Sequence, residues 1–228
     1  FGTIGDASTS EGHFWETINA AGVLQDPMAM SVWDDGFGIS VPNKLQTTKS
    51  SISEVLKGFE KTDDKDGFII LKAKGWDYAT LCKIYEEGVE YCRKNHVPVL
   101  FHITEVTQPQ GHSTSGSHER YKSAERLEWE KDYDCILQMR KWIISESIAS
   151  DAELDQIEKE AIERVKQARK SAWNNFQKPL NQLRDEFLKI ADVTTCSCAK
   201  TQKINAIKED LRQVADPIRK DIMSAAKK

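Results

Sequence analysis

Two short polar loops carry carboxylates that could hold a divalent cation. The first, Gly5-Asp6-Ala7-Ser8, leads through Ser10-Glu11-Gly12 into a helical pattern. Small residues between a strand and a helix let backbone N–H groups approach a phosphate, and the helix N-terminus adds a favourable dipole. Asp6 would repel that phosphate unless a cation lay between them, so it is a candidate ligand of Mg²⁺ or Ca²⁺. The alternative, that Asp6 or Ser10 only caps the helix, remains open.

The second loop is Asp34-Asp35-Gly36-Phe37, which follows its own short apolar run. If the two preceding strands are neighbours, Asp35 and the carbonyl groups around Phe37 can reach the same cation as Asp6. An ordinary Asp-Gly turn is the competing interpretation of this loop. Two such loops in adjacent strand–helix units favour a shared ion site more than either loop alone.

Alternating strand and helix patterns must position these loops. Helices are predicted over residues 13–24, 51–60 and 78–94, and strands over residues 1–5, 28–33, 67–72 and 97–103. Strands separated by helices predict an α/β fold, a parallel sheet in three layers with helices on both faces. Ligands of such sheets bind at the carboxyl ends of the strands. Both carboxylate loops and the segment after Ile103 belong to that edge.

The strand signal disappears after Ser147, and we divide the chain into residues 1–147 and an all-helical extension, 148–228. Apolar residues from Leu154 to Ile190 recur every 3.6 positions on average, which predicts an amphipathic helix that Pro179 should kink or interrupt. A second stripe with the same spacing, residues 204–222, predicts another helix. These stripes can pack against each other or the first domain, or can dock another subunit.

Composition narrows the class of protein. The chain has 228 residues, 39% hydrophobic and 30% charged, with no apolar run near the ~20 residues that span a bilayer. Residues 1–150 have a net charge of −7 and residues 151–228 of +3, so neither part has the basic surplus of a nucleic-acid-binding protein. Five cysteines, an odd number, indicate a reducing compartment. Cys196 and Cys198 could bind a metal, but no second Cys/His pair lies close in sequence.

The chain opens at Phe1-Gly-Thr-Ile-Gly5, which reads as the end of a strand with nothing before it. A natural domain rarely starts there. We therefore expect the chain to be part of a longer protein, and the first domain to be incomplete at its N-terminus.

Three ordered segments resemble one enzyme family. Gly5-Asp6-Ala7 followed by Asp35-Gly36 resembles the thiamine diphosphate motif, Gly-Asp-Gly followed further along by Asn-Asn. Ser10-Glu11-Gly12 and the tail Ile39-Ser40-Val41-Pro42 resemble the α part of the decarboxylating component of 2-oxo acid dehydrogenases. The segment 110–115, Gln-Gly-His-Ser-Thr-Ser, resembles the His-Ser loop over that family's active site. The resemblance covers roughly residues 1–147 and implies a thiamine diphosphate-binding fold.

The resemblance implies a role for each matching residue. Asp6 and Asp35 would bind Mg²⁺ through their side chains and Phe37 through its carbonyl oxygen. Gly5, Ala7 and Ser8 would contact the diphosphate, and Asn19 would support the site from the helix. His112 would hold the cofactor and assist acyl transfer. The regulatory loop would comprise Ser113, which matches a serine phosphorylated in mitochondrial relatives, together with Ser115, Tyr121 and Lys122.

Four positions depart from the family pattern. Ala7 replaces the second glycine of the motif, and Asp34 replaces an asparagine and adds a negative charge beside the cation. Trp33 stands where branched-chain relatives often have an arginine, and Lys122 replaces a loop arginine, which loses bidentate geometry. These departures bear on the affinity for the cofactor more than on the class of enzyme.

The implied activity is oxidative decarboxylation of a 2-oxo acid, with thiamine diphosphate and Mg²⁺ as cofactors and acyl transfer to a lipoyl group on a partner acyltransferase. Branched-chain 2-oxo acids are the first choice of substrate and pyruvate the second. The chain alone should be inactive, because the glutamate that activates the cofactor belongs to a β-like pyrimidine-binding domain or subunit. That part is either fused to this chain or bound to it, in a homo- or hetero-oligomer in the cytoplasm of a bacterium.

Two other functions remain open. The fold could be a non-catalytic assembly module with a degenerate cofactor site, an interpretation that rests on Asp34 and Trp33. It could also hydrolyse phosphate esters with Mg²⁺, using Asp6 and Asp35.

Overall fold

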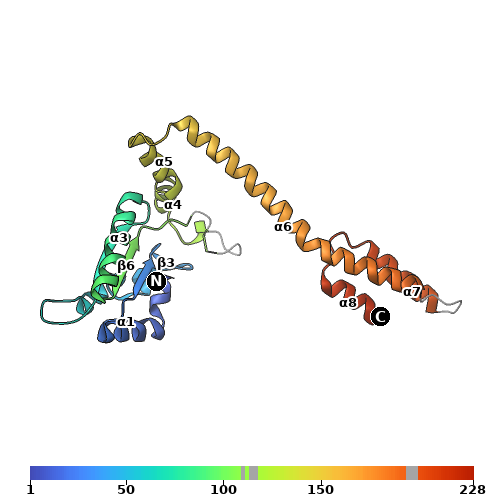
Figure 1. The fold of residues 1–228 in the computed structure, drawn as a ribbon, viewed down its shortest axis with the longest axis horizontal. Coiled ribbons are helices and arrows are strands. Elements are labelled where there is room, and N and C mark those ends of the chain that lie inside the picture. The colour runs from blue at the N-terminus through green and yellow to red at the C-terminus, as the bar shows by residue number, and fades with distance from the viewer. Residues whose placement is uncertain (109–110, 113–117, 194–199) are drawn as a thin grey trace. The chain divides into compact units, whose positions relative to one another are not determined.

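The computed structural model describes residues 1–108, 111–112, 118–193 and 200–228. The chain forms two compact units, Phe1–Ser150 and Asp151–Lys228, which are described separately below (Figure 1). Among the described residues, every helix is either too short or too polar to cross a bilayer.

The first unit is built on a sheet of four parallel strands. The strands are β1 (Gly2–Gly5), β2 (Ala29–Trp33), β5 (Ile69–Lys74) and β6 (Val99–Thr104), in the order β1-β2-β6-β5. Gly5 lies opposite Trp33, and Val32 opposite His102, so the ends of the first three strands are level. A small antiparallel pair, β3 (Phe37–Gly38) and β4 (Val41–Pro42), follows β2.

A hydrophobic core lies on each face of the sheet, between the strands and the helices that cover them. Helices α1 (Gly12–Leu24) and α2 (Ile52–Val55) pack on one face through Phe14, Ile18 and Ile52, and Leu100 of β6 belongs to this core. Helix α3 (Tyr78–Asn95) packs on the other face, where Val99, Phe101 and Ile103 meet Ile84 and Cys92. Alternate residues of β6 thus enter different cores, as expected for a strand buried on both sides. The predicted parallel sheet with flanking helices is confirmed.

The helix predicted over residues 51–60 is shorter than expected. It ends at Val55, continues as the 3₁₀ helix η4 (Leu56–Phe59), and then becomes extended. Gly58 weakens the helix, and the N–H of Phe68 donates to the carbonyl of Phe59, 2.7 Å away. The approach of Phe68 therefore draws residues 59–60 into strand-like pairing.

Two further helices, α4 (Ala124–Asp132) and α5 (Cys135–Ser145), complete the first unit. Each begins with a side-chain cap. Ser123 Oγ accepts from the N–H of Arg126, and Asp134 Oδ1 accepts from the N–H groups of Ile136 and Leu137.

The second unit contains only helices in its described residues. Helix α6 (Asp151–Val193) runs through Pro179 without a break. Of the two effects predicted for this proline, a kink or an interruption, the interruption is wrong. The helix predicted over 204–222 is instead two, α7 (Lys200–Arg212) and α8 (Arg219–Lys227), because Pro217 lacks an N–H and disfavours helical backbone in the residue before it. Leu188, Leu211 and Ile222 form the core of this unit.

We predict that Gly88→Ala destabilises the first unit. A methyl group at this position in α3 would lie 2.6 Å from ring atoms of Phe101 and 2.8 Å from Leu71. Overpacking of this kind costs about 1–3 kcal/mol, which urea denaturation measures as a lower free energy of unfolding. Gly58→Ala is the control, because a methyl group there would have no atom within 4 Å. Equal stability of the two variants would contradict the packing described for α3.

Candidate functional site

The two carboxylate loops leave the sheet side by side. Asp6 begins the 3₁₀ helix η1 (Asp6–Ser10) directly after β1, and Asp34 and Asp35 follow β2. Because Gly5 pairs with Trp33 in the parallel register, both loops start at the same level of the carboxyl edge. The arrangement expected from the sequence, with both loops at one edge, is present.

Asp34 is held by a buried chain of polar side chains. Its Oδ2 lies 2.9 Å from Nε2 of His102, whose Nδ1 is 2.8 Å from Ser53 Oγ. Its Oδ1 accepts the N–H of Gly36 at 2.8 Å. The side chains of Asp34, His102 and Ser53 are all buried. The backbone of Asp34 also donates to Ile103 in β6 and accepts from Val106 just after it. Both oxygens of Asp34 are therefore occupied by the fold.

The pKa of Asp34 reflects this binding. Burial alone would raise it, but the hydrogen bond and charge of His102 and the N–H of Gly36 outweigh burial, and the pKa lies below its usual value. The negative charge of Asp34 is consequently stabilised by groups of the protein itself, His102 and the N–H of Gly36.

Asp6 lies in the opposite situation. Its side chain is buried, with 6% of the residue exposed, and its Oδ2 has no hydrogen-bond partner among the described residues. Burial, followed by the negative charges of Asp34 and Asp35, raises the pKa of Asp6 to about 7. A buried carboxylate oxygen without a donor, beside two other carboxylates, has the chemistry that a divalent cation would satisfy.

Asp35 is half-buried and turned back on its own loop. Its Oδ1 accepts the N–H of Phe37 at 3.0 Å, and its carbonyl oxygen accepts from the guanidinium of Arg126 at 2.8 Å. Burial raises the pKa of Asp35, while the positive charges of Lys122 and Arg126 oppose the rise. The second oxygen, Oδ2, is not engaged by these contacts.

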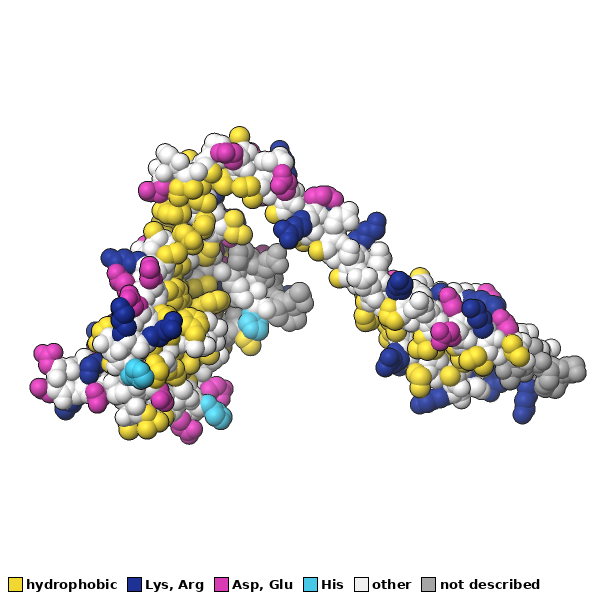
Figure 2. All heavy atoms as spheres, in the orientation of Figure 1, with side chains coloured by type: hydrophobic (Ala, Val, Ile, Leu, Met, Phe, Trp, Pro, Cys, Tyr) yellow, Lys and Arg dark blue, Asp and Glu magenta, His cyan; other side chains and the backbone are white. Residues whose placement is uncertain are grey.

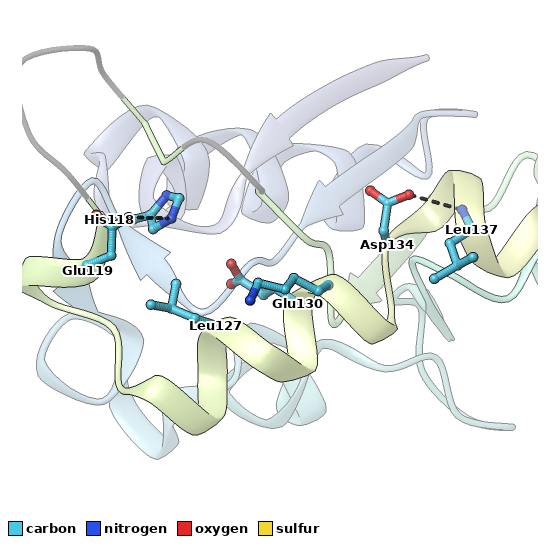
Figure 3. Close-up of a pocket in the computed structure, with 7 residues that line it drawn as sticks. His118, Glu119, Leu127, Glu130, Asp134 and Leu137 are labelled. Carbon is cyan, nitrogen blue, oxygen red and sulfur yellow. Dashed lines mark hydrogen bonds and ion pairs between the residues drawn. The ribbon is translucent and has the colours of Figure 1, made fainter. Parts of the chain in front are cut away.

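A buried ion-pair network supports this loop from α4. Lys122 Nζ lies 2.8 and 2.9 Å from the two oxygens of Glu130, and Arg126 Nε lies 2.8 Å from one of them. Both cations lie over the ring of Phe37, at 5.3 and 5.7 Å from its centre. Glu130 also faces a cavity of about 550 Å³ between His118 and α4 (Figure 3). The ammonium of Lys122 is therefore bound within the fold.

The first loop is held by Gln46. Its side-chain amide donates to the carbonyl of Ala7 at 2.8 Å and to Ser10 Oγ at 3.2 Å. A Cβ at Gly38 would lie 3.1 Å from the methyl group of Ala7 and 2.3 Å from Oε1 of Gln46. Ala7 is accommodated because the residue facing its methyl group has no side chain.

The remaining predicted residues lie in different surroundings. Gly5 and Ser8 are exposed beside Asp6, whereas Asn19 is exposed about two turns into α1, with no hydrogen bond to the Asp6 loop among the described contacts. His112 is exposed and follows Gly111, whose backbone has a positive φ. Tyr121 packs against Phe37, with ring centres 5.6 Å apart. Four predicted residues lie outside the described ones: Ser113, Ser115, Cys196 and Cys198.

The residues present fit a divalent cation bound by few side chains. No group of three or more His, Cys, Asp or Glu among the described residues could hold a metal. The predicted ligands are two carboxylates, Asp6 and Asp35, and one carbonyl oxygen, and hard cations accept such sets together with ligand phosphate and water.

Sequence reasoning missed the residues that support the site. His102 is one of them, although a histidine inside the apolar strand Val99–Thr104, opposite Val32 and two positions before Asp34, is a usable signal. Arg126 and Glu130, four residues apart, carried the signal of a helical ion pair. Nothing local in the sequence marked Gln46, whose partner Ala7 is 39 positions away.

Comparison with known proteins places these features in a family. The model of the family "Dehydrogenase E1 component" matches residues 1–180, which includes the first part of α6. The chain is 26% identical over 168 residues to the pyruvate dehydrogenase E1 component subunit alpha of Rickettsia bellii, covering 74% of this chain and 49% of that protein. It is 30% identical over 188 residues to the mitochondrial 2-oxoisovalerate dehydrogenase subunit alpha 2 of Arabidopsis thaliana, covering 80% and 38%. The chain thus spans about half the length of these relatives or less.

We predict that Asp6 makes stability depend on pH. Its pKa is 3.8 as an ordinary carboxyl and about 7 in the fold, so its contribution to stability is full below about pH 4 and is lost as pH rises through 7. In urea unfolding without divalent cations, Asp6→Asn should therefore stabilise the protein more at pH 8 than at pH 5. The control is Asp63→Asn in an exposed loop. The same effect of Asp6→Asn at both pH values would contradict the assignment.

We also predict that His102→Ala is strongly destabilising. The substitution leaves the buried Asp34 carboxylate and Ser53 hydroxyl without their partner, and breaking a buried pair in this way costs about 3–5 kcal/mol. His13→Ala, on the exposed face of α1, should change stability little. Thermal or urea unfolding of both variants measures the free energy that each substitution costs. If His102→Ala lowered the free energy of unfolding no more than His13→Ala, the Asp34–His102 pair would contribute little to stability.

Proposed function

Because the chain belongs to the dehydrogenase E1 component family, we propose that it forms the metal- and diphosphate-binding part of an enzyme that decarboxylates a 2-oxo acid. The cofactors are thiamine diphosphate and Mg²⁺. The observation that supports this most directly is Asp6, whose buried Oδ2 lacks a donor among the described residues and lies beside the loop of Asp35. A divalent cation supplies the missing partner and anchors the diphosphate.

The residues of the two carboxylate loops and of their supports each have a role in the proposal. Asp6 and Asp35 bind the cation with the carbonyl oxygen of Phe37, and the backbone from Gly5 to Ser8, exposed at both ends, faces the diphosphate. Gln46 and the Lys122–Glu130–Arg126 network hold the two loops in place, so they position the ligands without touching the cofactor. The bound cofactor supplies the electron sink that decarboxylation requires.

His112 is proposed to act at the reacting end of the cofactor. It is exposed on the loop that follows β6, whose end lies at the same edge as Asp6 and Asp34. A neutral imidazole there can hold or transfer a proton during acyl transfer. Asn19, exposed on α1, is proposed to support the site only in the complete protein, where the pyrimidine-binding part is present.

The proposed partners rest on the names of the relatives. The relatives are named as alpha subunits of pyruvate and 2-oxoisovalerate dehydrogenases, and the chain spans about half of them or less. We propose a β-like pyrimidine-binding partner, a lipoyl-bearing acyltransferase as acyl acceptor, and a bacterial cytoplasmic location. A branched-chain 2-oxo acid is the first choice of substrate and pyruvate the second.

The first test is calorimetric titration of thiamine diphosphate, with Mg²⁺ present, into the complete protein assembled with its pyrimidine-binding part. We expect saturable binding that Asp6→Asn weakens at least about 100-fold, because a metal ligand is lost. Asp63→Asn, an equivalent change at an exposed carboxylate, should bind like the wild type. Absence of binding to the wild type would favour the non-catalytic assembly module, and unchanged binding by Asp6→Asn would place the site elsewhere.

The second test separates two steps of the reaction. We predict that His112→Ala lowers acyl transfer to a lipoyl domain by at least about 100-fold and lowers CO₂ release with an artificial electron acceptor less, because a general acid–base group contributes about 10²–10⁴-fold to the step it serves. The rates with a branched-chain 2-oxo acid and with pyruvate, measured in the same assay, decide the substrate. Equal losses in both steps would assign His112 to cofactor binding instead.

A further inference from the structure

The first part of α6 carries an apolar face that the remaining helices of the second unit, α7 and α8, do not cover. The core of that unit involves Leu188 and other residues of the last part of the helix. Before Gln177, large apolar side chains are exposed, including Ile157 at 59%, Val165 at 67% and Phe176 at 53%. At 100° per residue, the following residues lie within 80° of Val165 on one side of the helix: Leu154, Ile157, Ala161, Ile162, Ala168, Ala172, Trp173 and Phe176.

The same segment is divided into an acidic and a basic half. Residues 151–163 contain six acidic residues and one basic residue, a net charge of −5. Residues 164–178 contain five basic residues and no acidic ones, a net charge of +5. Charged and hydrophobic side chains lie interspersed along this helix (Figure 2).

We propose that residues 151–176 of α6 pair antiparallel with the same segment of a second copy of this chain. An antiparallel arrangement places the acidic half of each helix against the basic half of the other, whereas a parallel one would oppose like charges over the whole length. A two-fold axis generates both complementary contacts at once, as in a closed dimer. The proposal does not depend on the cofactor or the reaction.

The apolar face fixes the register. It begins at Leu154 and ends at Phe176, so its midpoint is Val165, which would meet the Val165 of the other copy. In this register Leu154 lies opposite Phe176 and Ile157 lies opposite Trp173. Large side chains therefore meet at both ends, and small alanines lie nearer the middle, which lets two helices approach closely along roughly 35 Å.

Two charged residues lie near the centre line of the apolar face, whereas Asp155 lies at its edge, about as far from Val165 around the helix as Trp173. Glu158 is one turn after Leu154, and Arg169 is one turn after Val165. In the antiparallel register, position 158 lies opposite Ala172, one turn from Arg169 of the other copy. The dimer thus brings Glu158 and Arg169 together twice, across an interface that excludes water.

Disulfide cross-linking of the full chain tests the register. Val165→Cys should form an intermolecular disulfide with itself under mild oxidation. Leu154→Cys should not link to itself but should link to Phe176→Cys when the two proteins are mixed. Peptide mass mapping distinguishes these links from those of the native cysteines. A Leu154 self-link would show a parallel pair, and the absence of any Val165 link would show that another surface covers the face; either overturns the proposal.

Charge reversal tests the complementarity. In the Val165→Cys background, Glu158→Arg should slow cross-linking at least about tenfold, because it places like charges together at both pairs. Adding Arg169→Glu should restore the rate. Glu163→Arg is the matched control, with the same charge change on the opposite side of the helix, where Glu163 pairs with Lys166. Slowing by Glu163→Arg equal to that by Glu158→Arg, or failure of the double reversal to restore the rate, would refute the pairing.

Discussion

The buried pair between Asp34 and His102 is the interaction on which the carboxylate edge depends. Three carboxylates at the ends of two adjacent strands repel one another, and burial strengthens the repulsion because it removes water. His102 reaches from the neighbouring strand and binds one of them, while Ser53 fixes its ring from the other side. Both oxygens of Asp34 are bound within the fold, but its negative charge still raises the pKa of the neighbouring Asp6.

This pairing changes the meaning of the departure at position 34. An aspartate in place of an asparagine would add negative charge next to a cation, which was the argument for a degenerate site. In the fold, one oxygen of Asp34 binds His102 and the other binds the N–H of Gly36. The added charge is therefore matched by a residue 68 positions away, and the substitution at Asp34 has a compensating partner in the sheet. The assembly-module hypothesis loses one of its two supports, and Trp33 remains.

Local sequence patterns predicted the helices and strands, but they did not predict the contacts between residues that are distant in sequence. The strands before Asp6 and Asp34 and the helices α1 and α3 follow from periodicity, and a parallel sheet brings their ends together without further information. The helix at 51–60 was overestimated because Phe68, distant in sequence, draws its end into pairing. Gln46 could not be located because its partner Ala7 is 39 positions away. The pairing of His102 with Asp34, 68 positions apart, follows only from the strand order of the folded sheet.

In the proposed site, the raised pKa of Asp6 makes cation binding depend on pH. At neutral pH a proton and a divalent cation would compete for this carboxylate, so binding would release part of a proton and strengthen as pH rises. The free protein carries the cost of three crowded carboxylates, and any cation that binds only the folded state recovers it as stability. Asp34 is already held by His102 and by the N–H of Gly36, so in the proposed site the cation need satisfy only Asp6 and Asp35. The repulsion among the carboxylates that opposes folding is, in this proposal, the same electrostatic field that attracts the ion.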